Sequence, residues 1–484
     1  MKHSIELRTA AFAAALVFAL AVSGLAQEAE PGLPHGVSDP PQATLVNVPS
    51  VPGTLFIPKS SVAQPPQPGK LAAHTNVQIY VPAGIKPDEA PPFPGSGFET
   101  PASLACHYGL VTEPLGISPN CNPNLTTVNP TGGKDTIAIV DAYDDPEAPS
   151  DLAYFSAQFG IPFSVSQFQV VWANTLDSSC SFSGVGVDNT GGWEIEESLD
   201  IEWSHAMAPG ATIYLVEACS NYNYDFQQAV LVANNLVQCG QTEIDPSTLA
   251  LGTCPKVTGK GEVSMSWGEG EFTGENTTNC ASVGPYENPL DDGCFEAKDV
   301  VYFASSGDGP GVLYPSVSPK VVSAGGTSNR RNPSTFDWIA EAAWVDGGGG
   351  QSTIEKEPSY QKTYLASTVC ATWRCVPDLS FDSDPITGVY VYDTFPIDYT
   401  SYYTWWVVGG TSVAAPSLAG IVNNAGRFAA STDAELTTIY KNQGVTTDFT
   451  DITAGFCGFY MGFSAVTGWD PCTGVGVVNG HAGK

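Results

Sequence analysis

Basic residues are scarce in this chain. Of its 484 residues, 18 are Lys or Arg and 50 are Asp or Glu, which gives a formal net charge of −32. Nucleic acids and anionic membrane surfaces attract proteins through clustered basic side chains, so we expect neither as a partner. The excess of carboxyl groups suits a protein that stays soluble in acid, although many exported proteins are acidic without that need.

Long hydrophobic runs are also lacking, apart from residues 10–22 near the N-terminus. Lys2 and Arg8 precede this run, and the small-residue stretch 24–26 follows it. This order is typical of a signal peptide, which we assign to residues 1–26. The run is short for a transmembrane helix, so a retained anchor is the less favoured alternative. We expect a secreted, extracellular or periplasmic protein with no stable membrane span once the signal is removed.

Histidine is rare as well, with six residues in the chain. Four of them lie in the signal peptide, in the proline-rich segment after it or near the C-terminus, which leaves His107 and His205. Neither sits in a glycine-rich turn of the kind that presents a catalytic imidazole. A serine nucleophile with a histidine base is therefore weakly supported.

The twelve cysteines include no Cys-x-x-Cys pair, so a structural zinc site has little support. Their even number in an exported chain favours disulfides instead. The sequence leaves the connectivity open, and three pairs of neighbours are candidates: Cys106 with Cys121, Cys370 with Cys375, and Cys457 with Cys472.

Proline concentrates in residues 27–98, which we interpret as an N-terminal segment or linker, because long helices and central strands exclude this residue. The run 77–81 within it is β-like, so part of the segment is expected to pack on the main domain. From residue 99 to residue 484, apolar runs such as 136–140, 212–216 and 300–303 alternate with helix-like stretches at 148–159, 194–207 and 224–237. This alternation predicts an α/β domain with a mostly parallel sheet flanked by helices on both faces.

Two segments read Gly-Gly-Thr-Ser, at 325–328 and 409–412. Small and apolar residues after Ser412 predict a helix that begins there, whereas polar residues follow Ser328. A serine that follows a glycine-rich turn and opens a helix lies near free backbone N–H groups, which suits a nucleophile. The alternative for Ser412 is a plain helix N-cap.

Carboxyl groups are an alternative to histidine as the general base. Glu196 and Asp200 are four residues apart in a helix-like stretch and share a face, where mutual repulsion raises at least one pKa and favours a shared proton. Such a pair can act as a base in acid, although an ordinary solvated acidic face has the same spacing.

Asp308 follows the strand-like run 300–303 in a glycine-rich turn. If protonated, it could donate to an oxyanion, and its alternative is a simple turn residue.

Near the C-terminus, Asp451 and Asp470 lie in glycine-containing loops. Two carboxylates with backbone carbonyls can bind calcium, although the spacing does not match an EF-hand and two simple turns are the alternative.

Taken together, these motifs resemble those of the sedolisins, the serine-carboxyl peptidases related in fold to subtilisin. The resemblance covers about residues 99–480 and rests on five motifs in the family's order. They are the acidic pair Glu196 and Asp200 with 208–211 after it, the strand 264–268, the turn 306–308 with 314–327 after it, the nucleophile motif 409–416, and the pair Asp451 and Asp470.

The resemblance implies a subtilisin-like fold and a role for each motif. Glu196 would take the proton of Ser412 as its hydroxyl attacks a peptide carbonyl. Asp200 would orient Glu196, and protonated Asp308 would donate to the oxyanion. One structural calcium ion would be held by the side chains of Asp451 and Asp470 and by the carbonyls of Ile452, Gly468 and Val466.

The sequence departs from the family in four places. Gly409 stands where serine is usual, Val466 where glycine is frequent, and Asp141 where some members carry a glutamate that extends the acidic network. Only the proline-rich segment precedes the domain in this sequence, where the family has a large folded propeptide, so the control of activity stays open.

We therefore predict a secreted, acid-acting serine-carboxyl peptidase that cleaves protein or peptide substrates and acts as a monomer. The main alternative is a catalytically inactive sedolisin-like secreted protein that binds peptides or surfaces. A subtilisin-type enzyme with a histidine base and a calcium-dependent adhesion module are weaker alternatives, because histidines are few and adhesion needs no acidic pair. The sequence does not distinguish an endopeptidase from a tripeptidyl-peptidase.

Overall fold

The computed structural model describes residues 51–65, 71–86, 89–113, 120–173, 185–240, 256–278, 280, 290–397, 404–459 and 462–484. The predicted signal peptide and the proline-rich residues up to 50 lie outside this set. The described residues belong to one compact unit.

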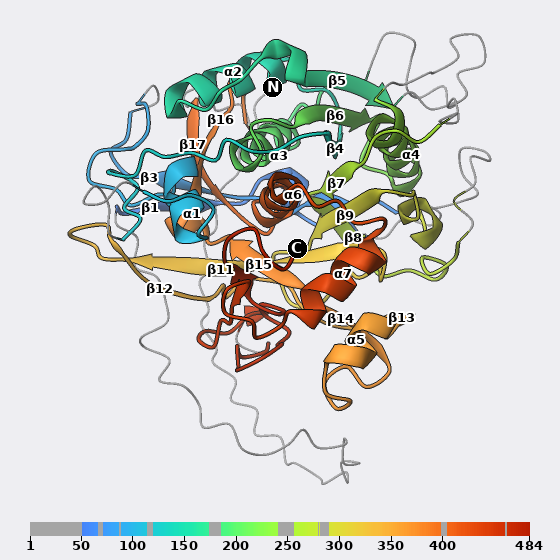
Figure 1. The fold of residues 1–484 in the computed structure, drawn as a ribbon. Coiled ribbons are helices and arrows are strands. Elements are labelled where there is room, and N and C mark those ends of the chain that lie inside the picture. The colour runs from blue at the N-terminus through green and yellow to red at the C-terminus, as the bar shows by residue number, and fades with distance from the viewer. Residues whose placement is uncertain are drawn as a thin grey trace, which may run out of the picture. The chain divides into compact units, whose positions relative to one another are not determined.

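A large, mostly parallel sheet runs through this unit (Figure 1). Its parallel strands pair in the order β15, β11, β9, β7, β4, β6 and β5, and β19 extends it beyond β15. Two antiparallel strands, β12 and β18, pair with β11 and β19. The bounds are β4 Thr136–Ala142, β5 Phe168–Ala173, β6 Thr212–Ala218, β7 Gly261–Met265, β9 Val300–Ser305, β11 Val322–Arg331, β12 Trp338–Ala343, β15 Leu379–Asp382, β18 Phe449–Thr450 and β19 Val477–Val478.

Helices cover both faces of this sheet, as the continuous burial of its strands requires. In β4, Ile137 and Ile139 join a core with α2 (Ala148–Phe159), α3 (Glu194–Met207) and α6 (Ala414–Ala425). Ala138 and Val140 point the other way and join a core with α4 (Asn223–Cys239). Figure 1 shows α3 and α6 side by side on one face and α4 on the other. The predicted α/β architecture is confirmed. Three shorter helices are α1 (Pro101–His107), α5 (Ser359–Tyr364) and α7 (Thr432–Lys441).

Smaller antiparallel sheets incorporate part of the proline-rich segment. One has the order β1, β3, β17 and β16, and another has the order β10, β8 and β2. The strands β1, β2 and β3 all lie before residue 98, so the described part of this segment packs on the rest of the unit, as expected. The bounds are β1 Gly53–Phe56, β2 His74–Thr75, β3 Gln78–Pro82, β8 Trp267–Gly270, β10 Leu313–Tyr314, β16 Val389–Tyr392 and β17 Trp405–Gly409, with β13 Gly350–Lys356 and β14 Trp373–Val376 forming a separate pair.

Disulfides join all three candidate pairs of neighbouring cysteines. A further bridge, Cys280–Cys294, was not anticipated from the sequence. In the part of the chain that the structure describes, no helix has both the length and the apolar character that crossing a membrane requires.

Candidate active site

Ser412 lies in the tight turn between β17 and α6, where two glycines are required. Gly410 has a φ of +104°, and a Cβ there would lie 2.1 Å from the carbonyl oxygen of Asn76. A Cβ at Gly409 would lie 2.3 Å from the backbone nitrogen of Pro385. This close packing gives a physical reason for glycine where the related motif usually has serine.

The Ser412 hydroxyl does not cap α6. The helix has Val413 as its N-cap residue and no side-chain cap bond. Instead, Ser412 Oγ donates to the carbonyl oxygen of Ser266 at 3.1 Å and accepts from the backbone N–H of Asn76 at 3.2 Å. Ser412 is fully buried. The simple capping role is therefore excluded in this structure.

Glu196 and Asp200 lie on the buried helix α3, so the alternative of a solvated acidic face is wrong. Burial and then the charges of Asp200 and Asp141 raise the pKa of Glu196 well above its ordinary value. The Ser412 hydroxyl lowers this pKa in part, and the charge of Asp308 raises it. The predicted nucleophile, acidic pair and oxyanion residue therefore lie close enough for their groups to interact.

Asp200 is connected to Ser412 through Ser266. The Ser266 hydroxyl donates to Asp200 Oδ1 at 2.7 Å, while the Ser266 carbonyl accepts from Ser412. Burial and the charge of Asp141 raise the pKa of Asp200, and the hydrogen bond from Ser266 lowers it in part.

Asp141 extends the carboxyl cluster from β4. It is fully buried, and burial raises its pKa to about 8. Because its charge acts on both Glu196 and Asp200, the three groups cannot all ionise at low cost.

Asp308 lies in the turn after β9. Its Oδ1 accepts hydrogen bonds from the Thr411 backbone N–H at 2.7 Å and the Thr411 hydroxyl at 2.9 Å. Its Oδ2 is buried and has no hydrogen-bond partner among the described residues. Burial raises the pKa of Asp308 to about 8, although the bonds from Thr411 lower it. In acid the group is therefore neutral and has a hydroxyl to donate.

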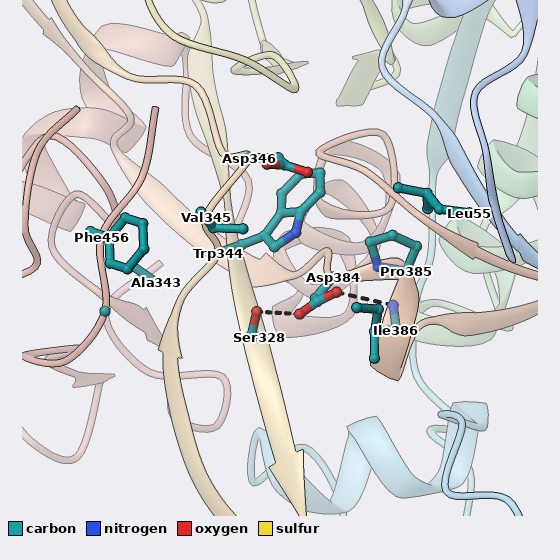
Figure 2. A pocket seen from close by; sticks show the side chains of 11 residues that line it. Leu55, Ser328, Ala343, Trp344, Val345, Asp346, Asp384, Pro385, Ile386 and Phe456 are labelled. Atoms are coloured by element: carbon teal, nitrogen blue, oxygen red, sulfur yellow. Dashed lines mark hydrogen bonds between the residues drawn. The ribbon is translucent and has the colours of Figure 1, made fainter. Parts of the chain in front are cut away.

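The second Gly-Gly-Thr-Ser serine has a different environment. Ser328 lies in β11 and donates its hydroxyl to Asp384 Oδ2 at 2.7 Å. Figure 2 shows this bond in a pocket lined also by Trp344, Asp346 and Pro385. Ser328 is a structural hydrogen-bond donor here.

Two histidines that the sequence left as possible bases make other contacts. His205 packs its ring edge-on against Phe163 with centroids 5.4 Å apart, and burial lowers its pKa to about 4. His107 Nε2 lies 2.9 Å from Glu341.

The predicted calcium residues meet at one loop. Asp451 Oδ2 accepts from the Gly468 backbone N–H at 2.9 Å, and Asp470 Oδ2 accepts from the Val466 backbone N–H at 3.0 Å. Ile452 follows Asp451 directly and is buried. Asp451 Oδ1 is buried with no partner in the described part of the chain. No group of three or more His, Cys, Asp or Glu suited to a metal occurs among the described residues, so carbonyl oxygens would have to supply the other ligands.

Two residues were not singled out from the sequence, namely Asn76, which contacts Ser412, and Ser305, which contacts Asn76. Asn76 Nδ2 donates to Ser305 Oγ at 2.7 Å. The β-like run 77–81 was the only signal near Asn76, and nothing local connected it to Ser412, which lies 336 residues away.

The chain is similar in sequence to proteins of a known family. No protein-family model matches the chain. Kumamolisin from Bacillus sp. (strain MN-32) is 30% identical over 370 residues, which are 70% of this chain and 57% of kumamolisin. Sedolisin from Pseudomonas sp. (strain 101) is 31% identical over 206 residues, which are 38% of this chain and 32% of sedolisin. The matches thus span about half or less of these relatives' length.

A solved structure has the same fold. Pseudomonas sedolisin, a serine-carboxyl proteinase complexed with two molecules of pseudo-iodotyrostatin, matches with a TM-score of 0.51 at 21% identity. The match covers 71% of this chain and 90% of that one. The sequence identity to kumamolisin and sedolisin supports the sedolisin family for this chain, and the solved structure shows that the fold is shared.

Proposed function

We propose that this protein is a secreted, acid-acting serine-carboxyl peptidase that hydrolyses protein or peptide substrates as a monomer, with Ser412 as its nucleophile. The observation that carries the proposal is the buried cluster in which the Ser412 hydroxyl and the carboxyl groups of Asp200 and Asp308 all act on the pKa of Glu196.

Glu196 is the general base in this proposal. The close carboxyl groups of Glu196, Asp200 and Asp141 ionise one after another, and the base is the form of the cluster that has lost its first proton and carries one negative charge. That charge accepts the proton of Ser412 at Glu196 as Ser412 Oγ attacks the peptide carbonyl, and Asp200 keeps its neighbour in place. A histidine would be protonated at the same pH and unable to accept.

The oxyanion of the tetrahedral intermediate is stabilised by two donors. One is the protonated Oδ2 of Asp308, and the other is the backbone N–H of Ser412. A single donor of this kind is worth about 10²–10³ in kcat. The intermediate then collapses to an acyl-enzyme, which water hydrolyses.

Calcium has a structural role in the proposal. The side chains of Asp451 and Asp470 and the carbonyls of Ile452, Gly468 and Val466 would hold the ion. The unpartnered Asp451 Oδ1 and the approach of both carboxylates to one loop support this ligand set. When bound, the ion would fix this loop rather than take part in the reaction.

Comparing wild type with Ser412→Ala on denatured protein at about pH 4 tests the proposal. We expect cleavage by wild type and none by Ser412→Ala. Ser328→Ala removes the serine of the other Gly-Gly-Thr-Ser segment and should retain activity. Equal cleavage by wild type and Ser412→Ala would remove Ser412 from the active site. A wild type that binds peptides without cleaving them would favour the catalytically inactive alternative.

A further inference from the structure

The pocket in Figure 2 lies beside the candidate active site. One of its lining residues, Asp346, is close enough to Asp308 for its charge to raise the pKa of that group. Another, Pro385, packs against Gly409, where a Cβ would lie 2.3 Å from the Pro385 nitrogen. The pocket therefore borders both the proposed oxyanion residue and the segment that leads to Ser412.

This pocket combines an apolar wall with two carboxyl groups. Its volume is about 80 Å³, far more than one water molecule needs, and its wall includes Trp344, Pro385 and Ile386. Figure 2 shows the Trp344 indole between the side chains of Asp346 and Asp384. None of the described residues that line the pocket is basic. An apolar wall with carboxyl groups suits the aliphatic stem and charged head of lysine or arginine.

The two carboxyl groups repel each other when both are ionised. Burial and then the charge of Asp384 raise the pKa of Asp346 to about 6, and the hydrogen bond from the Gln78 side chain lowers it in part. A positive charge beside both groups would offset this repulsion and favour their ionised forms. The electrostatics of the pocket therefore favour a cation over a neutral or acidic group.

The contact between Gln78 and Asp346 indicates which part of a bound chain reaches the pocket. The Asn76 carbonyl accepts from the Ser412 backbone N–H at 3.1 Å, and this N–H is one of the proposed oxyanion donors. It therefore marks the place of a reacting carbonyl. Gln78, two residues further on, lies opposite Gly409 in β17. A substrate strand in the same register would direct the second side chain after its scissile bond toward Asp346.

We propose that Asp346 and Asp384, with the apolar wall of this pocket, form a subsite that selects lysine or arginine as the second residue after the bond to be cut. This inference rests on the proposed peptidase function and adds a substrate preference to it. In this proposal both aspartates bind a substrate side chain and take no part in bond cleavage.

The experiment measures kcat/KM for two peptides that differ in one residue, and mass spectrometry of the products locates the cut. The second residue after the cut is lysine in one peptide and norleucine, which lacks the amino group, in the other. Because Asp346 also raises the pKa of Asp308, each variant is judged by the ratio of the two values. An altered oxyanion group affects both peptides and cancels in that ratio.

Wild type should prefer lysine by about ten-fold at about pH 6, as expected of a hydrogen bond to a charged group. The preference should fall at about pH 4, where Asp346 is protonated. Asp346→Asn should remove most of the preference at the higher pH, and Asp346→Glu, which keeps the charge, should retain part of it. Asp433→Asn makes the same change at an exposed carboxylate of α7 and should behave like wild type.

The outcomes separate this inference from the proposed function. Equal kcat/KM for the two peptides in wild type overturns the inference and leaves the function, and so does a full lysine preference in Asp346→Asn. Failure of wild type to cleave either peptide or denatured protein overturns both.

If Asp346→Asn does not fold, a third peptide with lysine one residue further on decides. Successive side chains of a strand point to opposite faces, so wild type should show no preference for lysine there. An equal preference at both positions would overturn the inference.

Discussion

Replacing Glu194 with glutamine should make the stability of this protein less sensitive to pH. Glu194 is fully buried at the start of α3, and its Oε1 accepts from the backbone N–H of Asp188 at 2.7 Å. Burial is the main cause that raises its pKa from 4.5 to about 9, and the charges of Asp188 and Asp145 add to it. Glutamine keeps the acceptor oxygen but has no proton to lose.

The size of the effect follows from proton binding. Between pH 4.5 and about 9 the folded state holds the Glu194 proton and the unfolded state does not. The contribution of Glu194 to the free energy of unfolding is therefore fully present below pH 4.5 and is lost as the pH rises toward 9. The loss is about 1.4 kcal/mol per pH unit, or about 2 kcal/mol between about pH 4 and pH 6. Whole domains are stable by only about 5–15 kcal/mol.

Denaturant unfolding at several pH values and fixed calcium concentration measures this effect. The wild type should lose stability between about pH 4 and pH 6, and Glu194→Gln should lose about 2 kcal/mol less. Burial raises the pKa of Glu217 as well, to about 10, so the wild-type decline should be steep. Glu147→Gln removes an exposed carboxylate and should follow wild type. An unchanged slope in Glu194→Gln, or a wild type that gains stability over this range, would refute the reasoning.

Further predictions concern the site and its support. Asp308→Ala should lower kcat by about 10²–10³ at acid pH, whereas Asp308→Asn, which can still donate, should retain most of it; equal losses would contradict an oxyanion role. Glu196→Gln should lower kcat by about 10²–10⁴ with little change in folding, measured by steady-state kinetics and circular dichroism. His205→Gln should stay active in acid, and its inactivity would favour a histidine base. EGTA should lower Tm, and Asp451→Asn should abolish that shift; a Tm indifferent to EGTA would argue against calcium.

Local patterns predicted much of the fold. The helix-like stretches 148–159 and 194–207 are α2 and α3 with the same bounds, and 224–237 lies within α4. These elements are long and have apolar faces, so periodicity identifies them. That Ser412 lies near Glu196 was inferred only through a family resemblance. Their proximity depends on the packing of α3 against α6, a tertiary contact that the spacing of residues within either helix does not reveal.

The contacts of the N-terminal segment escaped sequence reasoning for the same reason. Proline favoured a linker between residues 27 and 98, yet β3 became an inner strand paired on both edges. Non-local hydrogen bonding overrode the local preference. Likewise, the spacing of Glu196 and Asp200 did not reveal that they are buried, since burial depends on what packs on the helix.

The ladder between β1 and β3 has a consequence for how this part of the chain would respond to a cut between the two strands. While the chain is whole, β1 is tethered to β3 at a high effective concentration. After a cut between residues 57 and 78, the same ladder would join two separate polypeptides, and their dissociation would obey mass action. Dilution would then favour release of the N-terminal piece.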